Sequence, residues 1–317
     1  MQSLFIVFHF KTLSLKGTYN LHNMLKNNFL KKVFSKLLSE KSKQQIEKII
    51  LGIAIVSFVV HLALIYLVDF NWIAFDSDRE LLKNPIAAIY TPFSFILIYE
   101  VYLLIFYLPR SITTYIGKQY EIMTLIVIRR LFKDISAIEP SIRWFEIKEN
   151  LQFTYDLISA VLLFFILYLF YLESKKKRQK DSSTQINIAL FINIKKMIAM
   201  CLIPLLFSLA AFSLFSWAKG SFATPDLGQA FKNINHLFFD QFFSILISVD
   251  VILLLVSFFY TDDFHKVIRN SGFIISTILI RMSFAADGLT NTVLIVTAVL
   301  FGLTILTIHN KYEKIKE

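Results

Sequence analysis

The sequence predicts an all-α protein, a polytopic membrane helix bundle with about eight transmembrane helices. Three observations support this prediction. The chain of 317 residues is 56% hydrophobic and only 18% charged, whereas a soluble domain usually contains about 25% charged residues. Its 33 phenylalanines suit helices that face lipid. Apolar runs of about 20 residues, the length that crosses a hydrocarbon core, recur along the chain.

The composition also excludes several classes of function. A net charge of +10 is compatible with nucleic-acid binding, but the basic residues gather at the ends of apolar runs, where they set membrane topology. We therefore expect no nucleic-acid partner. The single cysteine, Cys201, cannot form an intramolecular disulfide. The sequence contains no phosphate-binding glycine loop, nucleophile elbow or zinc-protease motif, and it indicates no particular cofactor.

The first 47 residues are expected to precede the membrane domain. Residues 1–23 are interpreted as a disordered lead or a translation-start artefact, because Met24 opens a more plausible start. Residues 25–47 place apolar side chains and lysines at helical spacing, which predicts a basic amphipathic helix on an anionic lipid surface. The alternative is a positive flank of the first span, and both interpretations are cytoplasmic. The remainder, 48–317, is expected to be a single transmembrane domain.

Seven expected spans are plain apolar runs, and an eighth segment is not. The plain runs lie at about 49–68, 89–108, 157–172, 197–217, 242–260, 267–284 and 289–308. The eighth segment, 112–132, contains Lys118, Glu121 and Arg129 and is the least apolar of the set. Hydropathy by itself therefore leaves seven and eight spans open.

The distribution of lysine and arginine favours eight spans. If 112–132 crosses the membrane, the basic clusters at 175–180, 195–196 and 311–316 all become cytoplasmic, together with both termini. If it does not cross, the cluster at 175–180 falls on the outer side. The sequence therefore predicts a multi-pass protein of the cytoplasmic (plasma) membrane with its N- and C-termini in the cytoplasm.

Two acidic residues suggest an internal repeat. FSFILIYEVYLL, residues 93–104, aligns without a gap with FSILISVDVILL, residues 243–254, and Glu100 then corresponds to Asp250. Matches between apolar residues arise easily by chance, so the rare acid in the middle of each span is the informative match.

Two arginines in the following spans support the same repeat. IMTLIVIRRLF, residues 122–132, aligns with IISTILIRMSF, residues 274–284, and Arg129 corresponds to Arg281. An even number of spans in each half predicts a parallel four-plus-four repeat about an axis along the membrane normal. The halves are residues 48–178 and 194–317.

The repeated acids and arginines are the first candidates for a functional site. A charge in the middle of a span costs about 2.5–3.5 kcal/mol, so Glu100 and Asp250 should face the bundle interior. Arg129 and Arg281 are natural partners because each lies in the next span of the same half. The four residues either line an ion or solute path, with the acids as ligands or proton carriers, or form two buried ion pairs that fix helix packing.

A polar stripe adds to these candidates. Lys118, Glu121 and Arg129 are spaced by 3 and 11 residues and so share nearly one helix face, and Asn270 and Arg281 repeat the 11-residue spacing. Such a stripe on a spanning helix must face protein or water. It indicates either a hydrated interior or a structural network.

A possible metal site lies at a cytoplasmic junction between spans. Asp262, Asp263 and His265 offer two carboxylates and an imidazole, which can hold a divalent metal, although a solvated turn has the same composition. An intramembrane enzyme that uses this cluster is one functional hypothesis, and the sequence offers it no complete catalytic constellation.

Residues 247–284, ISVDVILLLVSFFYTDDFHKVIRNSGFIISTILIRMSF, resemble TerC-type membrane proteins, and residues 98–132 do so more weakly. Those proteins carry a mid-span acid, a short basic turn, and a next span with a small residue and an arginine. The resemblance implies metal-ion transport, with Asp250 matching the family's metal-site acid. The family's Asp-Asn dipeptide is absent, because Val251 follows Asp250, and this departure weakens the inference of metal-ion transport.

Taken together, these features favour a transporter or channel-like permease for a small ion or solute. The alternative is a non-transporting membrane subunit for assembly or interaction, in a homo-oligomer or a membrane complex. The lipid bilayer is the one partner that both hypotheses require.

The topology can be tested with cysteines introduced into a Cys201→Ser background. We expect Ser141→Cys to react with a membrane-impermeant maleimide in intact cells and Ser182→Cys to react only after permeabilisation, because 112–132 crosses the membrane. Labelling is read on the purified protein. The reverse pattern would support seven spans.

Overall fold

The computed structural model describes residues 36, 38–70, 88–135, 138, 142–176, 191–206, 208–209, 212, 227–258, 263–286 and 288–315. Within these ranges the regular elements are helices and there is no strand, as the all-α prediction requires. The helices are α3 (Glu40–Asp69), α4 (Tyr90–Tyr107), α5 (Ile112–Ile135), α6 (Lys148–Ser174), α8 (Leu227–Phe258), α9 (Phe264–Ser283) and α10 (Gly288–Ile315). A further helical stretch covers 191–206.

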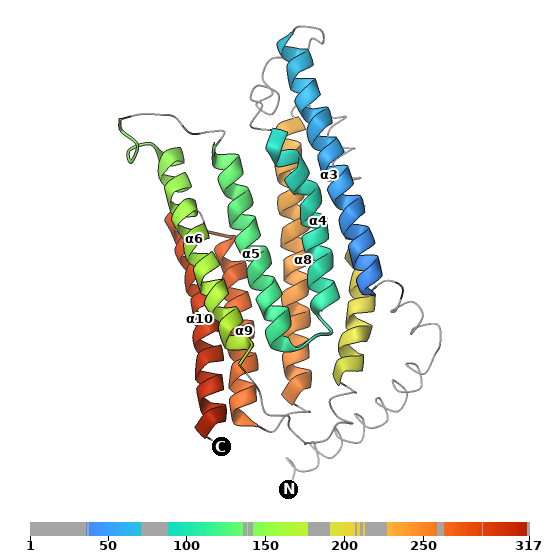
Figure 1. Ribbon diagram of the computed structural model, residues 1–317, viewed down its shortest axis with the longest axis vertical. Coiled ribbons are helices and arrows are strands. Elements are labelled where there is room, and N and C mark those ends of the chain that lie inside the picture. Colours follow the sequence, from blue (N-terminus) through green and yellow to red (C-terminus); the bar gives the residue numbers. More distant parts are fainter. Residues whose placement is uncertain are drawn as a thin grey trace, which may run out of the picture.

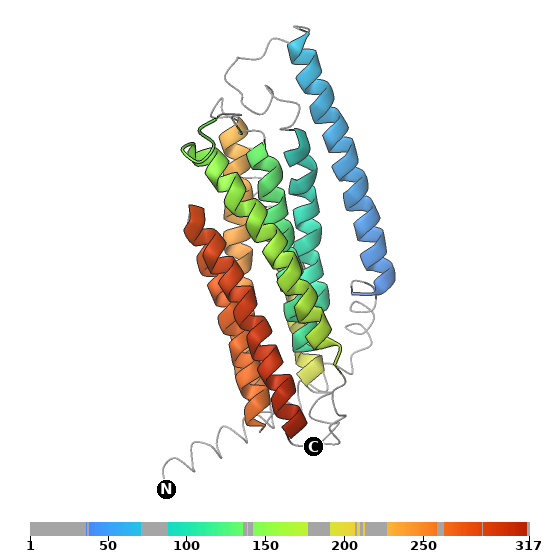
Figure 2. The same ribbon diagram turned by 60° about the vertical axis from the view of Figure 1, so that its left-hand side comes forward.

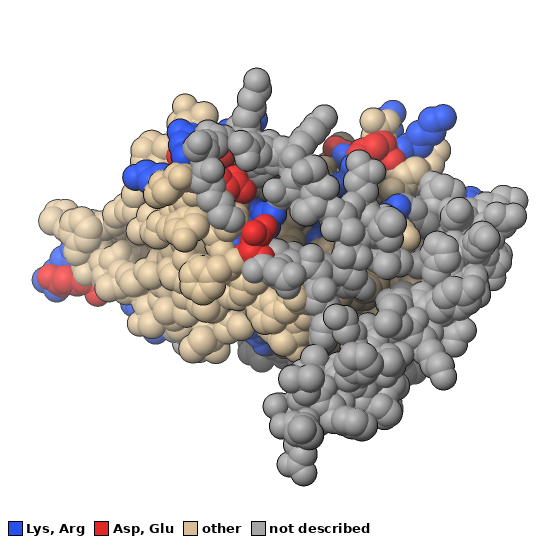
Figure 3. All heavy atoms as spheres, turned by 90° about the horizontal axis from the view of Figure 1, so that it is seen from below, with Lys and Arg blue, Asp and Glu red and all other residues tan. Residues whose placement is uncertain are grey.

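Successive helices run in opposite directions along the long axis of one bundle (Figures 1 and 2). We call one end of the bundle the terminal end. It holds Glu40 at the start of α3, Ile112 at the start of α5 and Ile315 at the end of α10. Seen from the terminal end, charged side chains of both signs are visible on this face (Figure 3).

Among the described residues, four helices are long and apolar enough to cross a membrane. They are Glu40–Asp69, Lys148–Ser174, Gln241–Phe258 and Gly288–Ile315, and the apolar segment Thr91–Tyr107 is shorter. This set is compatible with a membrane protein. Neither α5 nor α9 is in it, so the count of eight spans stays a prediction.

The helix α3 begins where its sequence provides a cap. The Ser39 hydroxyl accepts a hydrogen bond from the Ser42 backbone N–H at 3.1 Å, and the helix then continues from Glu40 to Asp69. The structure therefore shows no break at residue 47, where the surface helix 25–47 was expected to end. Residues 25–35 and 37 lie outside the described residues. Apart from Ala54 and Ile65, α3 buries little, which suits a helix that faces lipid.

The least apolar of the expected spans forms a helix in the interior of the bundle. Helix α5 contacts α4, α6 and α9, and its fully buried side chains include Ile116, Tyr120 and Met123. Its charged residues lower its average hydropathy, but neighbouring helices cover the helix on several sides. Its composition is therefore explained by its position, because α5 needs less lipid-facing surface than α3.

Small residues let the two halves of the chain approach closely. Gly302 of α10 lies against Tyr120 of α5, whose hydroxyl is 2.7 Å from the Ser276 hydroxyl of α9. Ser276 in turn donates to the Ala298 carbonyl at 2.6 Å. A side chain at residue 302 would occupy the position of the tyrosine. This packing and the α6–α10 contact join elements far apart in the sequence.

Several helices extend beyond the expected apolar runs. Helix α6 begins at Lys148 where the run began at 157, and α8 begins at Leu227 where the run began at 242. A hydropathy run stops at the first polar residues. The backbone hydrogen bonds of a helix can continue through those residues, because they join backbone groups and not side chains. The expected run thus marked the apolar part of each helix and missed its polar ends.

The close approach at Gly302 gives a stability prediction. A Cβ atom there would lie 1.7 Å from the Tyr120 hydroxyl oxygen, so we expect Gly302→Ala to lower the free energy of unfolding by about 1–3 kcal/mol. Gly52→Ala is the matched control, because a Cβ at residue 52 of α3 meets no atom within 4 Å. Thermal unfolding in detergent measures both. Equal stability of the two variants would contradict the packing described.

Candidate functional site

Asp250 of α8 is a buried carboxylate that a neutral side chain holds. It is 3% exposed, and Gln119 of α5 donates its Nε2–H to the Asp250 Oδ2 at 3.1 Å. Tyr115 lies one turn before Gln119 on the same face of α5 and close to Asp250. The Tyr115 hydroxyl is buried and has no hydrogen-bond partner among the described residues. The carboxylate, the amide and the hydroxyl form a compact polar group inside the bundle.

A buried lysine also acts on the Asp250 charge. Lys195, in the stretch 191–206, is 2% exposed, and its ammonium donates to the Arg110 carbonyl at 3.1 Å. The Asp250 and Lys195 charges act on each other, although no ion pair within 4.0 Å joins them in the described part of the chain. Burial lowers the pKa of Lys195 to about 8, and the Asp250 carboxylate partly offsets this effect. Asp250 is therefore not neutralised by a direct ion pair within the described residues.

Glu100 has a different environment from Asp250. Arg129 of α5 donates its Nη2–H to the Glu100 Oε2 at 2.5 Å, and both side chains are buried. The Arg129 guanidinium also lies over the Phe93 ring, 6.0 Å from its centre. This is the pairing that the order of the residues suggested. It compensates both charges without any bound ion.

Lys118 and Glu121 satisfy each other at the surface of α5. The Lys118 ammonium is 2.6 Å from the Glu121 Oε2, and both side chains are partly exposed. The Tyr171 hydroxyl of α6 also donates to Glu121. The polar stripe predicted for 112–132 thus divides into a partly exposed pair and the buried Arg129.

The second half does not reproduce these contacts. The Arg281 Nη2 is 3.5 Å from the Ser244 hydroxyl, and no ion pair joins Arg281 to Asp250 among the residues described. Ser244 precedes Asp250 by six residues, about 9 Å along α8, so Arg281 lies too far along the helix to reach the acid. The expected Asp250–Arg281 pair is replaced by the Gln119 contact. Asn270 accepts hydrogen bonds from its neighbour Arg269 at 3.0 and 3.2 Å.

Arg281 instead lines a pocket at the surface. The pocket has a volume of about 430 Å³ and is open to the exterior. Its lining residues are Leu209, Gln241, Ser244, Ile245 and Arg281.

A second buried ion pair was not anticipated from the sequence. Arg130 of α5 donates to both carboxylate oxygens of Asp156 on α6, which is 0% exposed. Gln152 and Thr292 also donate to Asp156, at 3.0 and 3.3 Å, and Arg130 reaches the Asn291 side-chain oxygen at 2.6 Å. The missed signal was the four-residue spacing of Gln152 and Asp156, which places both on one face of α6. The expected run began at 157 and left both residues outside.

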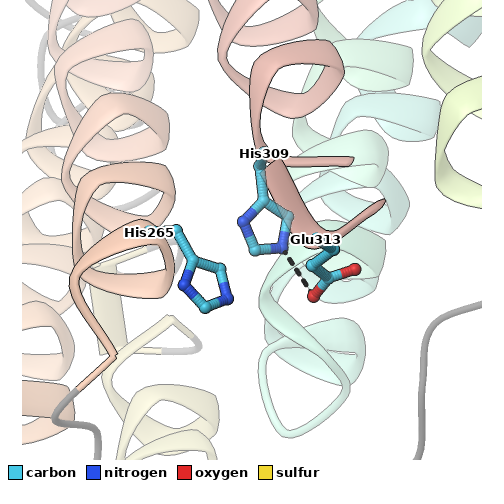
Figure 4. A group of neighbouring side chains, drawn as sticks. All are labelled: His265, His309 and Glu313. Carbon is cyan, nitrogen blue, oxygen red and sulfur yellow. Dashed lines mark ion pairs between the residues drawn. The ribbon is translucent and has the colours of Figure 1, made fainter. Parts of the chain in front are cut away.

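Of the expected metal candidates, the structure describes Asp263 and His265, and these two have different partners. Asp262 lies outside the described residues, and Asp263 pairs with Lys266 at 2.8 Å. His265 instead lies beside two residues of α10, His309 and Glu313 (Figure 4). No local spacing in the sequence links α9 with α10 at this point, because His309 and Glu313 are more than 40 residues away from His265.

No protein-family model, curated protein or solved structure matches this chain. The resemblance to TerC-type proteins therefore stays a prediction.

The Glu100–Arg129 pair gives a second stability prediction. Arg129→Met should lower the free energy of unfolding by about 3–5 kcal/mol, because it leaves a buried carboxylate unpaired. Unfolding by denaturant in mixed micelles measures the loss. Adding Glu100→Gln should recover part of it, since no charge then remains.

The matched control is Arg143→Ala. Arg143 is 3.8 Å from Glu146, and both side chains are more than two-thirds exposed. Its removal should change stability by less than about 0.5 kcal/mol. A similar small change for Arg129→Met would show that the buried pair contributes little.

Proposed function

We propose that this chain is a transporter or channel-like permease for a small cation, the proton included, and that Asp250 is its ion-binding group. The observation that carries the proposal is the state of Asp250. It is a buried carboxylate whose closest described partner is an uncharged amide. An ionisable side chain kept inside a bundle without a direct counter-charge indicates a functional site, because packing by itself favours an apolar residue there.

The chemistry around Asp250 supports binding and release. The Tyr115 hydroxyl and the Gln119 amide oxygen, with the carboxylate, are oxygen ligands that suit a proton or a small hard cation. The positive charge of Lys195 repels a cation bound at Asp250 and therefore favours release of that cation. A weak, multi-group site of this kind suits conduction better than permanent storage.

The position of the site supports access from the terminal end. Asp250 precedes the end of α8 at Phe258 by eight residues, about 12 Å of helix. Gln119 follows the start of α5 by seven residues, about 10 Å. Lys195 lies nearer to the terminal end, in the first turns of its helix. In this proposal, Lys195, Gln119 and Asp250 mark the route of the ion from the terminal end into the bundle.

We place the terminal end in the cytoplasm. Lys175 and Lys176 after α6, Lys195 and Lys196, and Lys311 and Lys314 in α10 all lie toward that end. This arrangement follows the positive-inside rule and suits eight crossings. The proposal includes the four-plus-four repeat. In it, Glu100 and Asp250 are equivalent residues whose partners have diverged.

The paired charges favour a second candidate function, a non-transporting assembly subunit. Glu100–Arg129 and Arg130–Asp156 are both compensated, as expected of residues that fix helix packing. A protein of this kind would co-purify with a stoichiometric membrane partner. Asp250 is the residue that separates the two hypotheses.

The transport proposal is tested in liposomes that contain the purified protein and a trapped pH-sensitive dye. A potassium gradient with valinomycin drives proton entry. Fluxes of Na⁺ and K⁺ are measured in separate vesicles without valinomycin. We expect Asp250→Asn to reduce flux of the transported ion by about tenfold or more, because the amide keeps the shape but not the charge.

Glu146→Gln is the control, because it removes a carboxylate from an exposed position. Size-exclusion chromatography confirms that each variant is folded. Two results would contradict the proposal: Asp250→Asn vesicles that conduct like the wild type, or wild-type vesicles no more permeable than empty ones to H⁺, Na⁺ and K⁺.

A further inference from the structure

Two histidines and a glutamate meet where α9 begins and α10 ends. His265 is the second residue of α9, and His309 and Glu313 lie in the last turns of α10. One ligand atom from each side chain lies within 4.8 Å of the other two. Figure 4 shows the two imidazole rings side by side, with the Glu313 carboxylate next to His309. The ring centres of His265 and His309 are 5.2 Å apart.

The backbone holds these side chains in place. His309 and Glu313 are four residues apart on one helix and therefore share a face, the spacing that lets two ligands reach one ion. Close packing of α9 on α10, which includes Gly272 against Ile305, brings His265 to the same face. The cluster is thus built by the helical hairpin and does not depend on a loop.

The positively charged side chain of Arg269 lies against the cluster. Arg269 lies one turn after His265, and its Nη1 is 2.9 Å from the His309 Nε2. The Glu313 Oε1 is 3.2 Å from the same nitrogen. An imidazole nitrogen that accepts from the guanidinium presents its lone pair, the form that binds metals. The lone pair and the carboxylate would repel each other unless a positive group lies between them.

We propose that His265, His309 and Glu313 bind a divalent transition metal, Zn²⁺ above all, with water as the fourth ligand. Imidazole nitrogens and one carboxylate form a ligand set typical of zinc. Tetrahedral zinc places its ligand atoms about 3.4 Å apart, and here they lie within 4.8 Å of one another, so the farthest pair must close by up to ~1.4 Å. Rotation about side-chain bonds provides this movement.

The metal would replace the Arg269 contact with His309. Arg269 retains a partner when this happens, because its Nε and Nη2 also donate to the Asn270 oxygen. His265 and Glu313 are partly exposed, so the ion can enter from solution at the terminal end. Three protein ligands and one water make an exchangeable site, unlike the closed sites of structural zinc.

The test is zinc binding to the full chain, purified in detergent with a tag that lacks histidine. Competition with a zinc-sensitive dye gives the stoichiometry and the dissociation constant for Zn²⁺ alone. We expect one high-affinity zinc per chain, with Mg²⁺ and Ca²⁺ unable to compete. His265→Ala and Glu313→Gln should each weaken binding by about tenfold or more.

Two further variants make the test specific. His61→Ala removes a histidine of α3 that contacts Thr91, and it should bind zinc like the wild type. Arg269→Gln removes the competing cation and should tighten binding several-fold, which a merely structural role of the cluster would not produce. Failure of the wild type to bind one zinc, or unchanged binding by both His265→Ala and Glu313→Gln, would overturn the proposal. The result is independent of ion flux, so it can succeed or fail separately from the transport proposal.

Discussion

A charged side chain inside an apolar bundle is stable only where the protein supplies its partner, and α5 carries several of the charges that face this requirement. Arg129 of α5 pairs with α4, and Arg130 pairs with α6. The two arginines are adjacent in sequence, so they leave the helix about 100° apart and bind it to two different neighbours. The interior position of α5 follows from this requirement.

The same requirement shows why the two mid-span acids are not equivalent. Glu100 meets an arginine directly, whereas Asp250 meets the Gln119 amide and lies within the influence of Lys195. A compensated pair stabilises the fold and is difficult to separate. A carboxylate held by neutral groups can exchange a proton or cation at lower cost, which is why we propose a functional role for Asp250 and a packing role for Glu100.

The helical hairpin of α9 and α10 combines close packing with polar groups at both ends. Near its turn, Gly288 adopts a φ of 59°, a conformation that suits glycine, and the Asn291 side chain donates to the Ser283 carbonyl. At the other end the two helices bring His265 and His309 together. Between these points the Ser276 hydroxyl donates to the Ala298 carbonyl across the hairpin. A ligand at the terminal end would therefore act on both helices.

The sequence by itself determined the helical class and the approximate position of most helices, and it indicated a membrane protein, because the length and composition of apolar runs are local properties. The order of residues also suggested the Glu100–Arg129 pair, but the same order suggested an Asp250–Arg281 pair that the structure does not form. Only the tertiary structure decided that Asp250 meets Gln119 and not Arg281, that Asp156 is buried, and that His265 lies beside His309. These contacts depend on how each helix is rotated about its axis and shifted along it. Hydropathy and spacing do not fix either quantity, because they describe one helix at a time.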